Sequence, residues 1–233
     1  MSIKKIIAGL TLSLLLSSGM ASADYNSAYS TYNSGDYKAA FKEMLPVAEG
    51  GHVDAQYWVA DMYRNGKGIQ KNLSAAVQWY TKSAEQGDRW AQADLGVMYA
   101  NGEGVLENDK TAVKWYTKAT EQGYAKAQYN LGLMYDHGEG VLENDKTAVK
   151  WYTKAAEQGD GKAQGNLGVI YANGGGVLKD NRRAYMWLNL GSYNGSEVAN
   201  KNKDKIAKQM TATDISQAQD MSSRCLESNY TEC

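Results

Sequence analysis

The chain has 233 residues, of which 25 are basic and 26 acidic. This near balance argues against nucleic acid as the main partner, because binding a phosphate backbone needs a clustered basic surface. The length suits one compact domain or one elongated repeat array.

Residues 1–23 have the pattern of a secretory signal peptide. Lys4 and Lys5 precede an apolar run over residues 6–16, and small residues follow up to Ala23. The run is too short to cross a bilayer, which takes about 20 apolar residues, so no membrane insertion is expected. We predict a mature chain that begins at Asp24, carries 23 basic and 26 acidic residues, and is exported to the periplasm rather than to the medium.

Residues 24–51 predict an N-terminal capping pair of short helices. Apolar residues spaced three and four apart lie on both sides of a break at Gly35 and Asp36. Terminal units of repeat arrays are commonly atypical, and this pair precedes a regular array.

A period of 36 residues organises residues 52–195. Residues 102–119 return unchanged as residues 138–155. Three residue types follow the same period: Trp79, Trp115, Trp151 and Trp187; Tyr63, Tyr99, Tyr135 and Tyr171; Gly66, Gly102, Gly138 and Gly174. The period predicts four repeats, at approximately 53–87, 89–123, 125–159 and 161–195.

Each repeat predicts two amphipathic helices. The first carries an alanine, a leucine or valine and a tyrosine on one face, and it ends at a pair of glycines that can adopt positive φ. Glycine recurs inside this helix at positions 96, 132 and 168, which predicts that a neighbouring helix passes too close for a side chain. The second helix begins near Asn108 or Asp109 in the second repeat and places its tryptophan in the core.

Residues 196–233 predict helices that cap the last repeat. Thr211 to Asp214 resembles a capping box that opens a final helix. Cys225 and Cys233 are the only cysteines, and in an exported chain we predict that they form a disulfide. No stretch predicts a β-sheet.

The pattern of glycine, alanine, tyrosine and tryptophan over residues 127–159, repeated across roughly residues 36–195, resembles the Sel-one-like repeat (SLR) family, relatives of the tetratricopeptide repeats. The resemblance implies an all-α fold, a right-handed α-solenoid of stacked antiparallel helix pairs, with about five pairs and C-terminal capping helices. It also implies that the first helices line a concave protein-binding face. One branch of the family, linked to β-lactam binding, has a disulfide in every repeat. This chain departs from that branch because its repeats contain no cysteine.

The resemblance places the candidate binding residues at fixed offsets around the first alanine of each repeat, where the repeats differ most. Asp54 occupies the position before that alanine in the first repeat. The predicted contact residues are Tyr57, Asp61, Arg64, Trp90, Val97, Tyr129, Leu133, Asp136, His137 and Val169. Tyrosine, tryptophan and arginine dominate binding hot spots. The alternative is that Trp90 and Tyr129 only pack between neighbouring repeats.

Other kinds of site have weaker support. The glycine pairs lack the third glycine and the preceding strand of a phosphate-binding loop. His52 and His137 have no metal-ligand spacing, and a capping role at a helix end is the better interpretation of His137. There is no G-x-S-x-G or S-x-x-K motif. We therefore predict no catalytic residues, no metal and no cofactor.

The predicted function is non-enzymatic protein binding outside the cytoplasm. Some exported bacterial members of the SLR family are immunity proteins, so the specific prediction is an immunity or inhibitor protein that occludes a toxin effector, such as a secretion-system phospholipase. The alternatives are an envelope scaffold or regulatory adaptor and, in another class, a hydrolase of cell-wall or β-lactam substrates.

Overall fold

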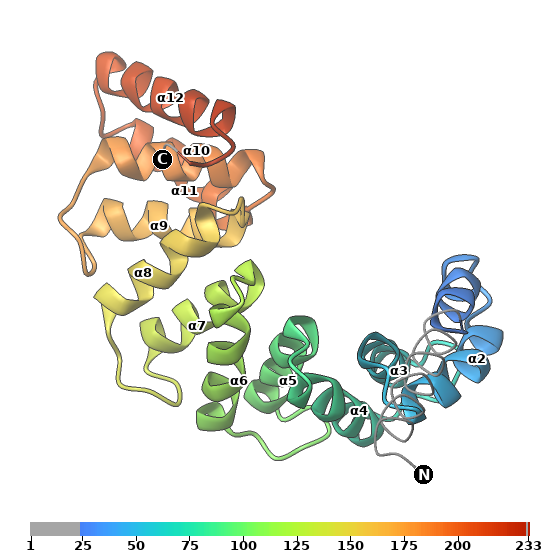
Figure 1. Ribbon diagram of the computed structural model, residues 1–233. Helices are drawn as coiled ribbons and strands as arrows, with labels where there is room; N and C mark the ends of the chain where they lie inside the picture. Colours follow the sequence, from blue (N-terminus) through green and yellow to red (C-terminus); the bar gives the residue numbers. More distant parts are fainter. Residues whose placement is uncertain (1–23, 232) are drawn as a thin grey trace, which may run out of the picture. The chain divides into compact units, whose positions relative to one another are not determined.

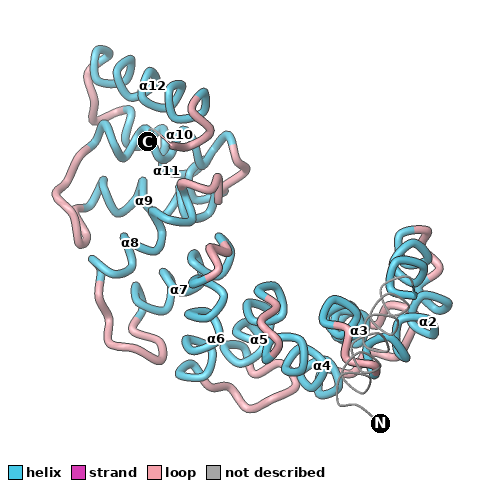
Figure 2. Tube along the Cα trace, in the orientation of Figure 1, coloured by secondary structure: helices cyan, strands magenta, loops and turns pink. Residues whose placement is uncertain are grey.

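The computed structural model describes residues 24–231 and 233, and the predicted signal peptide lies outside them. These residues are helical with no strand (Figures 1 and 2). Residues 24–33 form a helix, and the helices that follow are α2 (Tyr37–Glu49), α3 (Val53–Asn65), α4 (Leu73–Glu85), α5 (Arg89–Asn101), α6 (Asp109–Glu121), α7 (Ala125–His137), α8 (Asp145–Ala156), α9 (Gly161–Asn173), α10 (Asn181–Tyr193), α11 (Glu197–Ala207) and α12 (Ala212–Glu227). None of these helices is long and apolar enough to cross a membrane.

The helices form two compact units, one ending at Glu107 and the other beginning at Asn108. In the first unit, α3 packs on α2 and on α4, and α4 packs on α5. In the second unit, successive helices from α6 to α11 pack on one another, and α12 packs on α10. This stacking of consecutive helices confirms the predicted all-α solenoid fold.

The first helices end and the second helices begin as the sequence predicts. The first helices of the four repeats end at a glycine with φ between 67° and 85°, whose amide donates a hydrogen bond to the carbonyl four residues earlier. The second helices begin at an asparagine or aspartate whose side chain accepts a hydrogen bond from the first turn. Local residue chemistry therefore fixes the two helix ends that flank the loop inside each repeat.

The second glycine of each loop holds one repeat against the preceding second helix. Gly140 has φ +68°, and a Cβ built on it would lie 2.5 Å from the carbonyl carbon of Asp109 at the start of α6. Gly104 lies equally close to Leu73 at the start of α4. No side chain fits at these positions, which explains why each loop carries two glycines and not only the one that ends the helix.

The glycines inside the first helices also mark close approaches. A Cβ on Gly132 would meet the ring of Tyr152 at 2.7 Å, and a Cβ on Gly168 would meet Leu188 at 2.5 Å. The neighbour in each case is the second helix of the same repeat. The predicted lack of space is confirmed at these two positions.

Tyr80 and Tyr152 occupy the same position in α4 and α8, but their hydroxyl groups differ. Tyr152 donates a hydrogen bond of 3.0 Å to Asp136, whereas the buried hydroxyl of Tyr80 has no hydrogen-bond partner among the described residues. Burial raises the pKa of both phenols, and nearby carboxylates raise it further.

We expect Tyr152→Phe to lower the free energy of unfolding by about 1 kcal/mol, because it removes a satisfied hydrogen bond. Tyr80→Phe should leave it unchanged or raise it by up to about 1 kcal/mol, because it removes only an unsatisfied buried hydroxyl. Urea unfolding followed by circular dichroism measures both. Equal losses of unfolding free energy in the two variants would contradict the conclusion that only the Tyr152 hydroxyl has a hydrogen-bond partner.

The repeated tryptophans are less buried than predicted. Trp187 is 5% exposed and lies in the core, but Trp79, Trp115 and Trp151 are only half-buried. A lysine three residues later covers each of these rings, with its ammonium 3.9 to 4.8 Å from the ring centre. The core prediction therefore holds only in part for these three: Trp79 packs against the core around Met44, and at each position a lysine stem and ammonium cover the exposed part of the ring.

The C-terminal segment closes the second unit. Thr211 accepts a hydrogen bond from the amide of Asp214, so it caps α12 as predicted. Cys225 is fully buried and forms a disulfide with Cys233. Between them, Tyr230 packs on the core, and its hydroxyl accepts a hydrogen bond from Asn194 at 2.8 Å. The disulfide thus closes a loop that covers the end of α10.

Candidate protein-binding site

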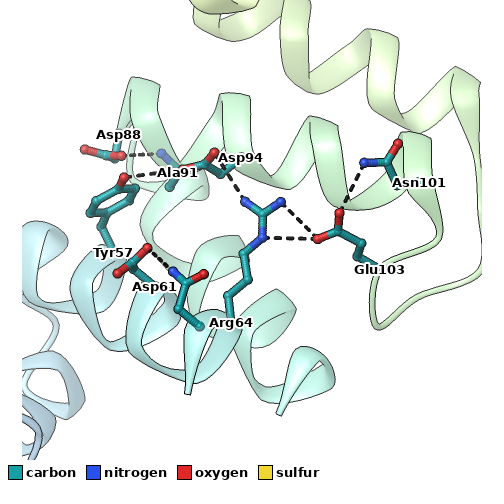
Figure 3. A network of polar contacts seen from close by, with 9 residues as sticks. Tyr57, Asp61, Arg64, Asp88, Ala91, Asp94, Asn101 and Glu103 are labelled. Atoms are coloured by element: carbon teal, nitrogen blue, oxygen red, sulfur yellow. Dashed lines mark hydrogen bonds and ion pairs between the residues drawn. The ribbon is translucent and has the colours of Figure 1, made fainter. Parts of the chain in front are cut away.

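A network of charged side chains links α3, α5 and the loop after α5 (Figure 3). Arg64, in the last turn of α3, donates two hydrogen bonds to one carboxylate oxygen of Glu103, at 2.9 and 3.1 Å. Its third contact is an ion pair with Asp94 in α5, at 3.5 Å. Burial alone lowers the pKa of Arg64, but the two carboxylates outweigh it and the pKa is raised. The guanidinium therefore stays charged and joins the two repeats.

Asp61 belongs to a second group of polar contacts on the same unit. It accepts a hydrogen bond of 2.6 Å from Asn65 and pairs with Lys67 at 3.4 Å. Lys67 also donates to the hydroxyl of Tyr32 at 2.6 Å, and this hydrogen bond raises the pKa of the lysine. The charge of Asp61 is thus matched within the unit.

An open pocket of about 460 Å³ lies beside this network. Its lining is five aromatic side chains and one carboxylate: Tyr25, Tyr29, Asp54, Tyr57, Trp58 and Trp90. We call this set the aromatic pocket. The side chain of Trp90 is the largest exposed group in it, since the residue is 41% exposed. Two elements before α5 build it, the helix at residues 24–33 and α3, together with the first turn of α5.

Tyr57 connects the aromatic pocket to the charged network. Its ring lies 6.2 Å from that of Trp90 between ring centres, and its hydroxyl donates to Asp94 at 3.3 Å. Because Arg64 in turn holds Asp94, the wall formed by Tyr57 is fixed before any partner arrives. Such preorganisation lowers the entropic cost of binding.

The structure gathers only some of the predicted contact residues. In the first unit, Tyr57 and Trp90 line the pocket, Arg64 and Asp61 lie in the polar contacts, and Val97 is half-buried in α5. In the second unit, no described pocket includes the predicted residues. Their contact role stays a prediction.

The predicted residues of the second unit are mostly used in packing. Tyr129 and Leu133 are half-buried against the core around Tyr152, and Val169 packs against the core around Leu188. Burial raises the pKa of Tyr129. The interpretation of Tyr129 as a packing residue is therefore the better one.

The two histidines differ from the expectation that His137 has a capping role. His137 is exposed at the end of α7, where the backbone of Gly138 supplies the cap, so the capping interpretation of His137 is wrong. His52 instead caps α3, with its Nδ1 accepting from the amide of Ala55 at 3.4 Å. Glycine with positive φ satisfies a helix C-terminus without any side chain, which leaves His137 no capping function.

Sequence reasoning missed most of the aromatic pocket. The pattern of residues 24–51 predicts only a capping helix pair there, and the sequence gives Tyr25, Tyr29 and Trp58 no binding role. Two tyrosines on one face of residues 24–33 and a Tyr-Trp pair at 57 and 58 were the available signals. Among the described residues, no group of three or more His, Cys, Asp or Glu side chains is arranged to hold a metal ion.

Comparisons with known proteins agree on the family. The Sel1 repeat matches at residues 53–88, 91–124, 125–160 and 161–196. No curated protein matches the chain. A protective antigen of uropathogenic Escherichia coli with an SLR fold is 35% identical over 90% of this chain, with a TM-score of 0.84, and the match spans 47% of that protein, about half its length.

Two other solved structures mark the range of similarity. A Sel1 repeat protein from Oxalobacter formigenes is 38% identical over 74% of this chain and 71% of its own, with a TM-score of 0.69. The immunity protein Pa5087 from Pseudomonas aeruginosa is 19% identical over 77% of this chain and 84% of its own, with a TM-score of 0.40, a level that carries no argument about function. From the four matched repeats and the two closer structures, the chain belongs to the Sel1 repeat family.

Proposed function

We propose that this chain binds another protein through the first unit, at the aromatic pocket and the charged network beside it. The observation that carries the proposal is the position of Trp90, which is 41% exposed next to Tyr57 and Trp58. Large aromatic side chains of this kind supply most of the free energy of protein association when a partner covers them. Arg64, Asp94 and Glu103 form a charged border on α3, α5 and the loop after α5.

The specific form of the proposal is an immunity or inhibitor protein that occludes a toxin effector, such as a phospholipase. Its support is the resemblance to exported members of the family, the predicted signal peptide and the disulfide. A disulfide is stable in an oxidising compartment such as the periplasm, where such an effector acts. Occlusion needs only binding, and this site offers a binding surface without a nucleophile paired to a base.

The test starts from residues 24–233, purified with the disulfide intact and immobilised on a resin. The resin is then incubated with a periplasmic extract. Mass spectrometry identifies what is retained, and calorimetry of the purified partner measures the stoichiometry. We expect one protein partner whose enzymatic activity falls on binding. The absence of any stoichiometric protein partner would contradict protein binding, and a partner without an activity to inhibit would contradict the inhibitor role alone.

The site is tested with the partner so identified. Trp90→Ala should weaken its affinity at least tenfold, about 1.4 kcal/mol, because it removes the most exposed ring of the aromatic pocket. Tyr193→Ala is the matched control, since Tyr193 is an exposed aromatic residue at the end of α10, outside the site. If both variants bind as the unchanged protein does, the site lies elsewhere.

A further inference from the structure

The aromatic pocket has the composition of a cation-binding site. Its six lining residues include two tryptophans, three tyrosines and one carboxylate, and none of them is basic. Aromatic faces carry negative electrostatic potential and attract an ammonium or a guanidinium. A carboxylate on the same wall adds a full negative charge to that potential.

Asp54 is the carboxylate, and no described side chain neutralises it. It lies half-buried in the first turn of α3, and no hydrogen bond or ion pair joins it to another side chain among the described residues. The three acidic groups of the neighbouring polar contacts contrast with it, since Asp61 pairs with Lys67, and Asp94 and Glu103 pair with Arg64. The charge of Asp54 therefore remains available inside the pocket.

The surroundings of Asp54 extend the negative potential. Burial raises the pKa of Tyr25, and the nearby carboxylates of Asp54 and Asp88 raise it further. His52 stacks on the Tyr25 ring at 4.5 Å between ring centres, and its Nδ1 accepts a hydrogen bond from the backbone.

The charge of the whole first unit has the same sign. Residues 24–107 contain 11 acidic and 7 basic residues, a formal charge of −4, whereas residues 108–233 contain 15 acidic and 16 basic residues, a charge of +1. One guanidinium already contacts an aromatic residue of the pocket, because Arg89 lies 5.1 Å from the ring centre of Trp90. The pocket thus lies on the acidic unit and contains a ring that accepts a cation.

We propose that the aromatic pocket binds an arginine or lysine side chain presented by a protein partner, with Asp54 as its counter-ion and the rings of Trp58 and Trp90 against its apolar stem. This inference rests on the proposed function, since it names the chemistry of the partner at the same site. A flat guanidinium or a flexible ammonium chain fits between aromatic walls and leaves its charge at the carboxylate.

The experiment uses a probe that needs no identified partner. N-acetyl-arginine methylamide and N-acetyl-lysine methylamide are titrated into ¹⁵N-labelled residues 24–233, and the tryptophan indole N–H signals are followed by NMR. N-acetyl-citrulline methylamide, which has the shape of the arginine probe without its charge, is the matched control. We expect the indole signals of Trp58 and Trp90 to shift with the cationic probes and to remain in place with citrulline.

Two variants assign the binding to the pocket. Asp54→Asn should weaken binding of the arginine probe at least fivefold, while Glu85→Gln, which removes an exposed charge of the same unit, should leave it unchanged. Equal shifts with citrulline, equal binding by Asp54→Asn, or no shift at all would overturn the inference. If the probes fail but a protein partner binds and depends on Trp90, protein binding stands and only the cationic specificity is wrong.

Discussion

Gly140→Ala should lower the free energy of unfolding of the second unit by about 3 kcal/mol. Two costs contribute. At φ +68° the backbone is in the left-handed region, which costs a residue with a Cβ about 1–2 kcal/mol. The new methyl group would also lie 2.5 Å from the carbonyl carbon of Asp109, and forcing extra volume into a packed contact costs about 1–3 kcal/mol. Urea unfolding followed by circular dichroism measures the loss.

The control for this prediction is Gly123→Ala. Gly123 has φ +76°, close to that of Gly140, but a Cβ on it would meet nothing within 4 Å. Gly123→Ala should therefore lower the free energy of unfolding by only about 1 kcal/mol, the cost of placing an alanine in the left-handed backbone region. The difference between the two variants therefore isolates the contact between the loop and α6. If the two losses are equal, the second glycine of the loop has no role in stacking the repeats.

The repeat frame could be predicted because it depends on short-range chemistry. Asparagine caps such as Asn108, helix-ending glycines such as Gly102 and the small residue at Gly132 act within a few residues or on the partner helix of the same repeat. Because the period is fixed, each of these residues recurs at the same position in successive repeats. Physical causes this local are visible in the sequence without any knowledge of the fold.

The aromatic pocket could not be predicted in the same way. Its rings come from the atypical N-terminal helix at residues 24–33, from α3 and from the start of α5. Tyr25 and Tyr29 have no counterparts in the later repeats, so comparison between repeats gives them no role. Helical spacing shows that a residue lies on one face, but the depth of its burial depends on what that face meets.

The same limit explains the tryptophans and the loop leucines. Periodicity places Trp115 on an inner face, but Lys118, one turn later, covers its outer side. Leu106 and Leu142 lie inside the duplicated stretch, yet they are 91% and 90% exposed. The duplicated residues therefore supply the stacking contacts through Gly104 and Gly140 without every member being buried.

One position carries side chains with different interactions in repeats that have the same backbone arrangement. Arg64 and Asp136 occupy the same place in the first and third repeats, near the end of the first helix. Arg64 joins two carboxylates of the neighbouring repeat, whereas Asp136 accepts a hydrogen bond from Tyr152 within its own repeat. The stacking contacts leave this side chain free to vary, so it is a position where the surface can differ between repeats of this chain.

Reduction of the Cys225–Cys233 disulfide should lower the free energy of unfolding by about 2.5 kcal/mol and the melting temperature by about 5–10 °C. The two cysteines are 8 residues apart, and closing a loop of this size lowers the conformational entropy of the unfolded chain, which stabilises the fold by about 2.5 kcal/mol. For a protein of this length, a loss of about 2.5 kcal/mol corresponds to a decrease in melting temperature of about 5–10 °C. Tyr230 should also lose its fixed hydrogen bond with Asn194, because the loop that carries it is no longer closed.

Calorimetry with and without reductant measures the effect, and Cys233→Ser is the control. This variant should melt at the temperature of the reduced protein and should not respond to reductant, because the exposed end of the chain tolerates serine. Thiol labelling confirms that the disulfide has been reduced. A melting temperature unchanged by complete reduction would contradict a stabilising role. If the loss is observed, the chain reaches its full stability only in an oxidising compartment, which ties the fold of its last helices to the predicted export.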